Sequence, residues 1–377
     1  MRVHNFSAGP AAIPLEILEQ AQAELCDWQG SGMSVLEVSH RGKDFVACAA
    51  HAEELMRQVL GVPDNYRVLF LQGGATGQFA AVPMNLSDPG EVAAFLNTGQ
   101  WSGKAIKAAL AQGVEVQVVA DEDASNYTTV PTPGSFTIDP GTRYLHYTPN
   151  ETIGGVEFGY VPDPGDTVPL VADFSSSLLS EPLEVNRFGL IYAGAQKNMG
   201  PAGLTLVIVC DDLLGHARPE TPDIFNYAKM AASDSMLNTP PTFGIYLLGL
   251  TLEWIIARGG LEAMAVRNRV KADLLYSAID SSRLYHNPVA PDARSRMNVV
   301  FTLSDPDQGP GSGSGPGPDP DQELTDAFVA GAAEAGLVNL KGHRSVGGIR
   351  ASLYNALELE DVEVLVTFMA EFEAAHC

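Results

Sequence analysis

The apolar positions fall into short runs that alternate with segments of helical spacing. Seven runs, each bounded by glycine or polar turn residues, predict strands at residues 67–71, 91–96, 114–119, 143–147, 168–172, 190–193 and 204–209. Between them the spacing predicts helices, for example at residues 78–86 and 102–112. This alternation is typical of an α/β domain built on a parallel sheet.

The pattern changes after about residue 245. Helices are predicted at 244–257 and 261–279, then a strand at 297–303, a helix at 322–335, a strand at 348–352 and a helix at 360–374. A chain of 377 residues exceeds one typical domain. We therefore expect an N-terminal segment (1–15) packed on the small domain or on a partner subunit, a large domain (16–260) and a small C-terminal domain (261–377). The acidic Pro/Gly run at 304–321 predicts a flexible surface insertion without a catalytic part.

Several predicted strands end in polar or glycine-rich loops, at residues 72–77, 97–101 and 173–176. Open α/β sheets bind ligands at the carboxyl ends of their strands. The sequence therefore predicts a cofactor site at this edge of the sheet.

One lysine follows a predicted buried strand. Leu190 to Ala193 are apolar, Gly194 and Ala195 leave space, and Lys197 comes next. A partly desolvated lysine loses affinity for its proton and becomes an amine nucleophile able to form a Schiff base. The alternative is an ordinary surface lysine after a strand.

Composition narrows the classes of function. Hydrophobic residues make up 45% of the chain, no run of about 18 apolar residues occurs, and the first residues lack the apolar block of a signal peptide. The four cysteines are widely scattered, which predicts no metal site and a reducing, cytoplasmic setting. The net charge of −24 argues against a nucleic-acid partner. Such an acidic surface fits life at high salt and ordinary solubility equally well.

Other loop residues supply what pyridoxal phosphate requires. Asp173 could hold the protonated ring nitrogen, although it could equally cap a helix. Trp101 could stack on the ring, or be ordinary packing. The glycine-rich turn at 73–78 opens a helix and could bind phosphate. Gln196 and the turn at Asn238 and Thr239 offer further donors. Each signal is modest, and their combination is much stronger.

Eight motifs carry a resemblance to a known family. They are NFSAGP (5–10), EVSHRGK (37–43), QFAAVP (78–83), PNETI (149–153), ADFSS (172–176), YAGAQKN (192–198), NTPPT (238–242) and KGHR (341–344). From about residue 4 to 375 the chain resembles the phosphoserine aminotransferases, within the class V aminotransferases. The resemblance implies the pyridoxal-phosphate-dependent fold type I, an α/β fold with a mostly parallel seven-stranded sheet and a smaller α/β domain.

The resemblance also implies roles for cofactor-binding residues. Lys197 forms the Schiff base, Asp173 pairs with the pyridinium nitrogen, Trp101 stacks on the ring and Thr152 contacts the ring hydroxyl. The phosphate is held by Ala75, Thr76 and Gln196, joined by Asn238 and Thr239 from the second subunit of a homodimer with shared active sites. Many family members carry arginine where this chain has Thr76, so we expect a modest change in cofactor affinity.

The implied reaction is reversible transamination of 3-phosphohydroxypyruvate with L-glutamate, giving O-phospho-L-serine and 2-oxoglutarate in serine biosynthesis. Arg350 takes the α-carboxylate, and Arg41 with His40, His343 and Arg344 takes the phosphate or the distal carboxylate. Cationic anchors of this kind suit substrates with two anionic groups. Whether the chain also accepts the related phosphorylated substrate of vitamin B6 synthesis stays open.

Three other classes of protein fit the sequence less well. A cysteine desulfurase of the same fold needs a nucleophilic cysteine on a mobile loop, and neither Cys210 nor Cys377 suits. A nicotinamide-dependent dehydrogenase needs a G-x-G-x-x-G turn after the first strand, which is missing from the sequence. A non-catalytic binding protein of the same fold predicts loss of Lys197 or Asp173, and both are present.

Overall fold

The computed structural model describes residues 2–304 and 320–377. The predicted insertion at 304–321 therefore lies outside the described residues, except for Ser304, Pro320 and Asp321. Ser304 is buried, and Asp321 caps the following helix by accepting a hydrogen bond from the Leu324 N–H.

All seven strands predicted before residue 245 are present, and they form one sheet. Its order is β2 (Tyr66–Leu71), β10 (Thr205–Cys210), β9 (Leu190–Gly194), β8 (Leu170–Asp173), β5 (Leu145–Tyr147), β3 (Val92–Asn97) and β4 (Glu115–Asp121). The strands are parallel except β10, which runs antiparallel to both β2 and β9. The mostly parallel sheet expected from the sequence is confirmed.

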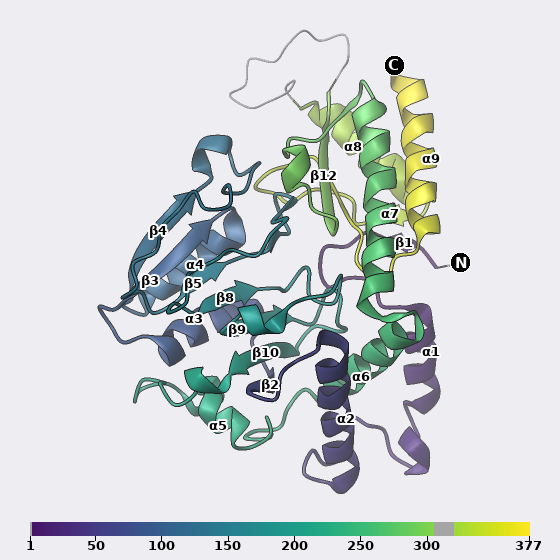
Figure 1. Cartoon of the computed structure of the whole chain (residues 1–377). Helices are drawn as coiled ribbons and strands as arrows, with labels where there is room; N and C mark the ends of the chain where they lie inside the picture. The colour runs from purple at the N-terminus through teal and green to yellow at the C-terminus, as the bar shows by residue number, and fades with distance from the viewer. Residues whose placement is uncertain (1, 305–319) are drawn as a thin grey trace.

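Helices cover both faces of this sheet (Figure 1). One face packs against α1 (Leu15–Glu24), α2 (Lys43–Leu60) and α6 (Thr242–Ala257), and the other against α3 (Gly74–Leu86), α4 (Gln100–Ala111) and α5 (Tyr227–Ala231). Helix α6 is apolar around almost its whole circumference because it lies between the sheet and α2. Both faces of the sheet are therefore buried except at the edge strand β4, which explains the continuous apolar runs of its inner strands.

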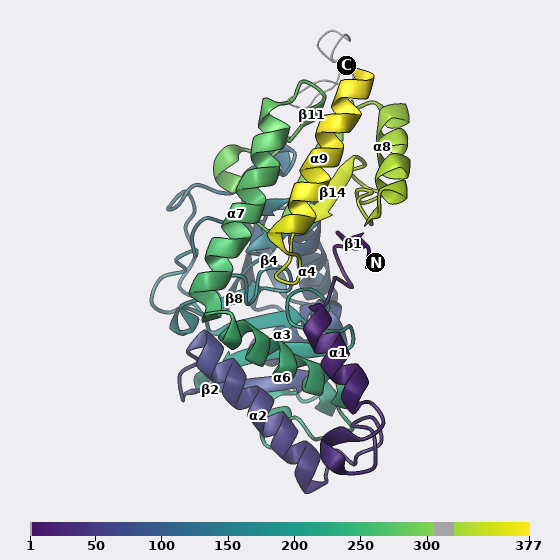
Figure 2. The same ribbon diagram turned by 90° about the vertical axis from the view of Figure 1, so that its right-hand side faces the viewer.

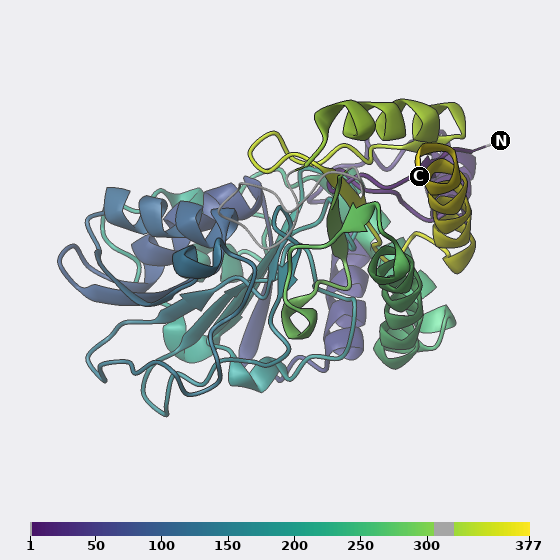
Figure 3. The same cartoon turned by 90° about the horizontal axis from the view of Figure 1, so that it is seen from above.

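The C-terminal part has a separate hydrophobic core. A three-stranded antiparallel sheet of β11 (Tyr285–His286), β12 (Asn298–Leu303) and β14 (Ile349–Ser352) packs against α7 (Gly260–Ser281), α8 (Gln322–Glu334) and α9 (Leu359–His376). Helices α7 and α9 lie side by side (Figure 2), and seen from above these green and yellow elements stand beside the large sheet (Figure 3). The proposed domain boundary at residue 260 stays a prediction.

The N-terminal segment joins the C-terminal core. Strand β1 (His4–Asn5) pairs in parallel with β13 (Leu337–Val338), and Phe6 is buried in the C-terminal cluster. The chain then crosses to the large sheet, where the Ala11 N–H donates to the Gln196 carbonyl over 2.8 Å. Residues 8 and 9 are thereby held beside the loop that carries Lys197.

The remaining elements are short. They are the hairpin of β6 (Asn150–Glu151) and β7 (Val156–Glu157), and the 3₁₀ turns Trp28–Gly30, Asp123–Ser125, Val185–Arg187, Asp211–Leu213, Asp223–Phe225 and Pro291–Ala293. No single helix of the described chain has the length and apolarity to cross a membrane. Only α6 and α7 together meet that test, and the pair is bent by 82° at its junction.

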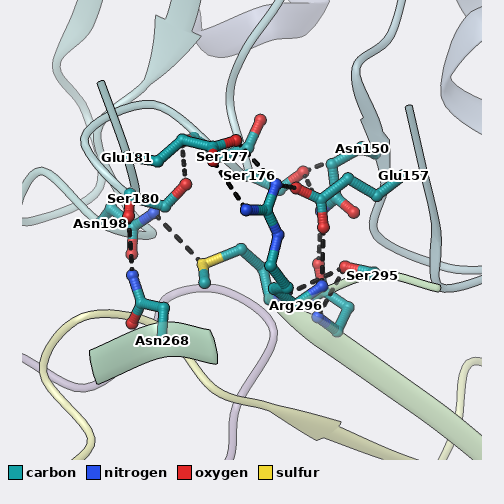
Figure 4. Close-up of polar contacts among 12 residues, drawn as sticks. Asn150, Glu157, Ser176, Ser177, Ser180, Glu181, Asn198, Asn268, Ser295 and Arg296 are labelled. Carbon is teal, nitrogen blue, oxygen red and sulfur yellow. Dashed lines mark hydrogen bonds and ion pairs between the residues drawn. The ribbon is translucent and has the colours of Figure 1, made fainter. Parts of the chain in front are cut away.

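A polar seam joins the two cores. The guanidinium of Arg296 lies between the carboxylates of Glu157 and Glu181, with N–O distances of 2.6–2.8 Å (Figure 4). Burial raises the pKa of Glu157, and the nearby Arg296 charge opposes that shift. Beside this cluster, Asn298 accepts from the Asn150 amide over 2.8 Å. The seam thus fixes the small sheet against the hairpin.

Candidate active site

A cavity of about 290 Å³ opens at the carboxyl ends of the large sheet's strands. Its lining comes from segments that are far apart in the sequence: Ala8 and Gly9, the start of α3, Trp101 on α4, residues 148–153, the ends of β8 and β9, and the C-terminal residues His343 and Arg350. Parallel strands bring their carboxyl ends to one edge, which is why loops distant in sequence meet here. A larger cavity of about 560 Å³ lies near Phe158 and Tyr160, but no lysine lines it.

Lys197 lies in the loop after β9 and is only 9% exposed. Its Nζ donates to the Thr152 hydroxyl over 2.7 Å. Burial lowers the pKa of Lys197 to about 8, and the Arg350 charge adds to this shift while Asp173 opposes it. The desolvation expected from the sequence is therefore present, and the neutral fraction of this amine at pH 7 rises to about one tenth, far above that of an ordinary lysine.

Asp173 ends β8 with its carboxylate buried. Its Oδ1 accepts from the Ser175 N–H over 3.0 Å. Burial raises the pKa of Asp173, whereas the bonds from Ser175 and the charge of Lys197 oppose that shift. The helix-cap alternative is wrong, because a turn and not a helix follows Asp173. The carboxylate instead faces the cavity that Lys197 lines.

Trp101 lies in the first turn of α4 and is half-buried at the cavity wall. The Nζ of Lys197 is 5.8 Å from its ring centroid. The indole Nε1 is buried without a hydrogen-bond partner among the described residues. The ring thus lies within reach of a flat ligand bound to the lysine.

The glycine-rich turn is itself the beginning of α3. That helix starts at Gly74, four residues before the predicted start, because Gly73 and Gly74 adopt positive φ angles of 94° and 63° and bend the chain directly into it. The Gly74 N–H donates to the Thr205 hydroxyl over 2.7 Å. The next N–H groups, of Ala75 and Thr76, have no carbonyl four residues earlier within the helix and border the cavity. Such a helix N-terminus favours a phosphate group.

The predicted substrate-binding cations divide into two groups. His343 and Arg350 line the cavity, and the Arg350 guanidinium donates to the Thr152 carbonyl over 3.3 Å. His40, Arg41 and Arg344 do not line it. Burial lowers the pKa of His343, and the charges of Arg350, Arg344 and Lys104 act in the same direction. The Arg350 guanidinium is thus a cation at the wall of the cavity, in a chain of net charge −24.

Two predicted phosphate ligands also lie elsewhere. Asn238 lines a different cavity, of about 130 Å³, beside Gly73. The Thr239 carbonyl accepts from the Gln72 side chain over 3.1 Å. Both side chains are exposed in the single chain. Both residues lie next to the glycine-rich turn that begins α3, but they do not line the cavity that contains Lys197.

Several lining residues had no role assigned from the sequence: Ala8, Gly9, Thr148, Asn150, Ile153, Ser175 and Ser176. The residues at 148, 150 and 152 could have been found together, because alternate positions of an extended chain point to one side. Ser175 and Ser176 lie two and three residues after Asp173, so their place in the same strand-end loop was a further available signal.

The cavity fits pyridoxal phosphate. It offers an amine for the aldehyde, a buried carboxylate for the ring nitrogen, an aromatic ring for stacking and a helix N-terminus for the phosphate. Thr148 Oγ1, Asn150 Oδ1 and Trp101 Nε1 line it and are buried without protein partners in the described structure. Buried polar atoms of this kind are normally satisfied, and a polar ligand would satisfy them.

Known proteins resemble the chain over its full length. The profile of the family Aminotransferase class-V matches residues 3–365. The phosphoserine aminotransferase of Azotobacter vinelandii is 53% identical over 375 residues, covering 100% of this chain and 99% of the relative. That of Pseudomonas aeruginosa is 52% identical with the same coverage.

Solved structures give the same result. The phosphoserine aminotransferase of Bacillus circulans subsp. alkalophilus superposes with a TM-score of 0.93 at 46% identity, over 100% of this chain and 99% of that chain. The pyridoxal-phosphate-bound enzyme of Trichomonas vaginalis gives 0.90 at 41% identity, over 98% and 100%. The chain therefore has the α/β fold of the type I pyridoxal-phosphate-dependent aminotransferases and belongs to the class V aminotransferase family, among the phosphoserine aminotransferases.

Proposed function

We propose that this chain transfers an amino group reversibly between L-glutamate and 3-phosphohydroxypyruvate, giving 2-oxoglutarate and O-phospho-L-serine for serine biosynthesis. The observation that carries the proposal is the buried amine of Lys197, which shares one cavity with Asp173, Trp101 and Arg350. The close relatives named phosphoserine aminotransferase support the choice of substrate.

Each residue at the cavity has a separate task. When bound, pyridoxal phosphate supplies an aldehyde for the amine and a ring that takes up electrons from the substrate. With the cofactor bound, the free Lys197 amine would take the proton from the substrate Cα as a general base, and its ammonium would then deliver that proton to the former aldehyde carbon as a general acid. Asp173 keeps a proton on the ring nitrogen, and the Trp101 indole orients the ring by stacking. Thr152 holds the lysine Nζ at the site where that proton moves.

Recognition of the substrate requires two anion sites. The Arg350 guanidinium, fixed by the Thr152 carbonyl, is placed to hold the α-carboxylate. His343 and Arg344 lie on the loop before β14, and we assign them to the phosphate or to the distal carboxylate of glutamate. His40 and Arg41 complete this anion site from a second subunit.

We therefore also propose a homodimer with shared active sites. His40, Arg41, Asn238 and Thr239 lie off the cavity of their own chain, so they are available to a neighbouring one. Exposed apolar side chains around α1, α2 and the loop between them offer an interface: Leu15, Leu18, Met33, Leu36 and Val46. Exposed apolar side chains that a partner subunit covers would be buried in the dimer. We also propose a reducing, cytoplasmic setting, because the four cysteines are widely scattered along the sequence.

A transamination assay tests the proposal. With 2-oxoglutarate as acceptor, the wild type should convert O-phospho-L-serine at least about 100-fold more efficiently than L-serine. The reason is that L-serine has no phosphate, so the cationic residues of the phosphate site would face no charge partner. Arg344→Ala should raise KM for phosphoserine about tenfold with little change in cofactor affinity. Arg269→Ala, an exposed arginine on α7, is the control. Equal turnover of serine and phosphoserine would contradict the assignment.

The same assay with phosphohydroxythreonine as the amino donor tests whether the chain also accepts the substrate of vitamin B6 synthesis.

A further inference from the structure

Glu151 is a buried carboxylate that the proposed reaction leaves without a role. It is 1% exposed and lies on the short strand β6, between two residues that line the cavity, Asn150 and Thr152. Because alternate side chains of an extended segment point to opposite sides, its carboxylate is directed away from the cavity, toward α4.

Its two oxygens accept hydrogen bonds from two backbone N–H groups in the first turn of α4. Oε2 accepts from the Trp101 N–H over 3.0 Å, and Oε1 accepts from the Ser102 N–H over 2.8 Å. The Ser102 hydroxyl lies a further 2.8 Å from Oε1. These backbone groups have no carbonyl partner within the helix, and a negative charge at this end is favoured by the helix dipole. One carboxylate therefore fixes the backbone of Trp101 directly.

The chain leaves space for this contact at Gly99. A Cβ atom at that position would lie 2.6 Å from the Glu151 Cδ and 2.8 Å from its Oε2. The carboxylate is held by its bonds to α4 and cannot withdraw without breaking them. Glycine at position 99 is therefore required by the close approach of Glu151 to the helix.

The same carboxylate acts on the charges of the cavity. Together with Asp173 it favours the protonated form of Lys197, opposing the effect of burial. Burial raises the pKa of Glu151, while the N–H groups of Ser102 and Trp101 oppose that shift. Since both oxygens receive N–H donors, the bonding pattern matches the ionised carboxylate.

We propose that Glu151 is a positioning residue, which acts through Trp101: by holding the first turn of α4 it sets the indole against the ring of the bound cofactor. The proposal rests on the proposed cofactor chemistry. Glu151→Gln replaces one oxygen with an N–H₂ donor that faces a backbone N–H, so the first turn of α4 shifts. Gly99→Ala should have the same effect, because it displaces the carboxylate without changing its charge.

A matched control is present on the same hairpin. Glu157 is also a buried carboxylate, but its partner is the Arg296 guanidinium and not α4 (Figure 4). Glu157→Gln therefore removes a buried charge from the same element without touching Trp101. Any effect of Glu151→Gln that Glu157→Gln reproduces reflects general destabilisation of the hairpin.

Fluorine NMR of protein labelled with 5-fluorotryptophan gives the decisive readout. The chain has three tryptophans, so the Trp101 resonance is assigned by its loss in Trp101→Phe. In cofactor-free protein we expect this resonance to move in Glu151→Gln and in Gly99→Ala, and to stay in place in Glu157→Gln. The dissociation constant for pyridoxal phosphate should rise at least about tenfold in the first two variants only.

A Trp101 resonance that stays in place in both Glu151→Gln and Gly99→Ala would overturn the proposal, as would an equal displacement in Glu157→Gln. If Glu151→Gln does not fold, Gly99→Ala carries the test. A wild type that fails to bind pyridoxal phosphate would contradict the proposed function, whereas the fluorine shifts of cofactor-free protein would still decide whether Glu151 positions the indole.

Discussion

The Nζ of Lys197 lies 2.7 Å from the hydroxyl oxygen of Thr152, and both groups are buried at the cavity. The hydroxyl accepts from the ammonium, so it stabilises the charged form against the effect of burial. The neighbouring Arg350 donates to the carbonyl of the same threonine. Thr152 thus links the nucleophile to the residue assigned to the substrate carboxylate.

Thr152→Val should lower the pKa of Lys197 further, by about one unit, because a charged donor loses its acceptor while side-chain volume is kept. The pH dependence of pyridoxal phosphate binding to cofactor-free protein measures this shift. Thr148→Val is a matched control, since the Thr148 hydroxyl also lines the cavity but has no partner among the described residues. A midpoint that stays in place or rises would contradict the role of the hydroxyl.

Lys197→Met should stabilise the cofactor-free protein at neutral pH. The pKa of Lys197 falls from 10.5 to about 8 on folding, so between these values the unfolded chain holds a proton that the folded chain has lost. The free energy of unfolding therefore rises with pH across this window, and the full cost, about 3 kcal/mol, is present below pH 8.

Urea unfolding of the wild type and Lys197→Met at pH 7 and pH 10.5 checks this difference. The variant should be more stable at pH 7, and the gap should shrink at pH 10.5. A gap that is constant or reversed would show that burial does not destabilise the ammonium.

The second buried lysine should behave in the opposite way. Lys271 is 2% exposed, and its Nζ donates to the carbonyls of Leu353, Tyr354 and Leu357, each over 2.9 Å. Lys271→Met leaves the buried carbonyls of Leu353 and Leu357 without a donor, whereas that of Tyr354 still accepts from the Leu357 N–H. Burial lowers the pKa of Lys271 to about 7, so removing the amine also removes a cost of burial. Because the lost hydrogen bonds outweigh this gain, the free energy of unfolding should fall by about 2 kcal/mol. Urea unfolding beside Lys107→Met, an exposed lysine of α4, measures the loss. Equal stability of the two variants would contradict this role.

Shared active sites should allow two inactive variants to restore activity. In a hybrid dimer of Arg41→Ala and Lys197→Ala, one site receives Lys197 from one chain and Arg41 from the other. Half of the dimers are hybrids with one intact site of two, so co-expression should recover about a quarter of wild-type activity. Lys197→Ala combined with Asp173→Asn is the control, because both residues come from one chain and no site is repaired. Recovery in neither mixture would contradict a shared site.

The large sheet was predictable because its strands are short apolar runs between turn residues. The antiparallel direction of β10 could not be predicted, because a strand buried on both faces has the same apolar pattern in either orientation. The sequence predicts the start of α3 four residues too late, because glycines weaken a helical pattern, although here they form the first turn of the helix.

The cations and the lysine of the site could be found from the sequence, but two buried ionisable residues, one on β6 beside the site and one on α7, could not. Glu151 and Lys271 have the residue types of a solvated surface, and only the partners supplied by distant segments explain their burial. His40 and Arg41 show a further limit. Neither residue lines the cavity of its own chain, and only the proposed dimer would bring them to a site, that of the neighbouring subunit.

Covalent trapping tests the central role of Lys197 most directly. The wild type is saturated with pyridoxal phosphate, reduced with borohydride, digested and examined by mass spectrometry. We expect a single cofactor-modified peptide, with the modification on Lys197, and none in Lys197→Ala. Modification of another lysine, or a wild type without modification, would contradict the assignment of Lys197 as the residue that binds the cofactor.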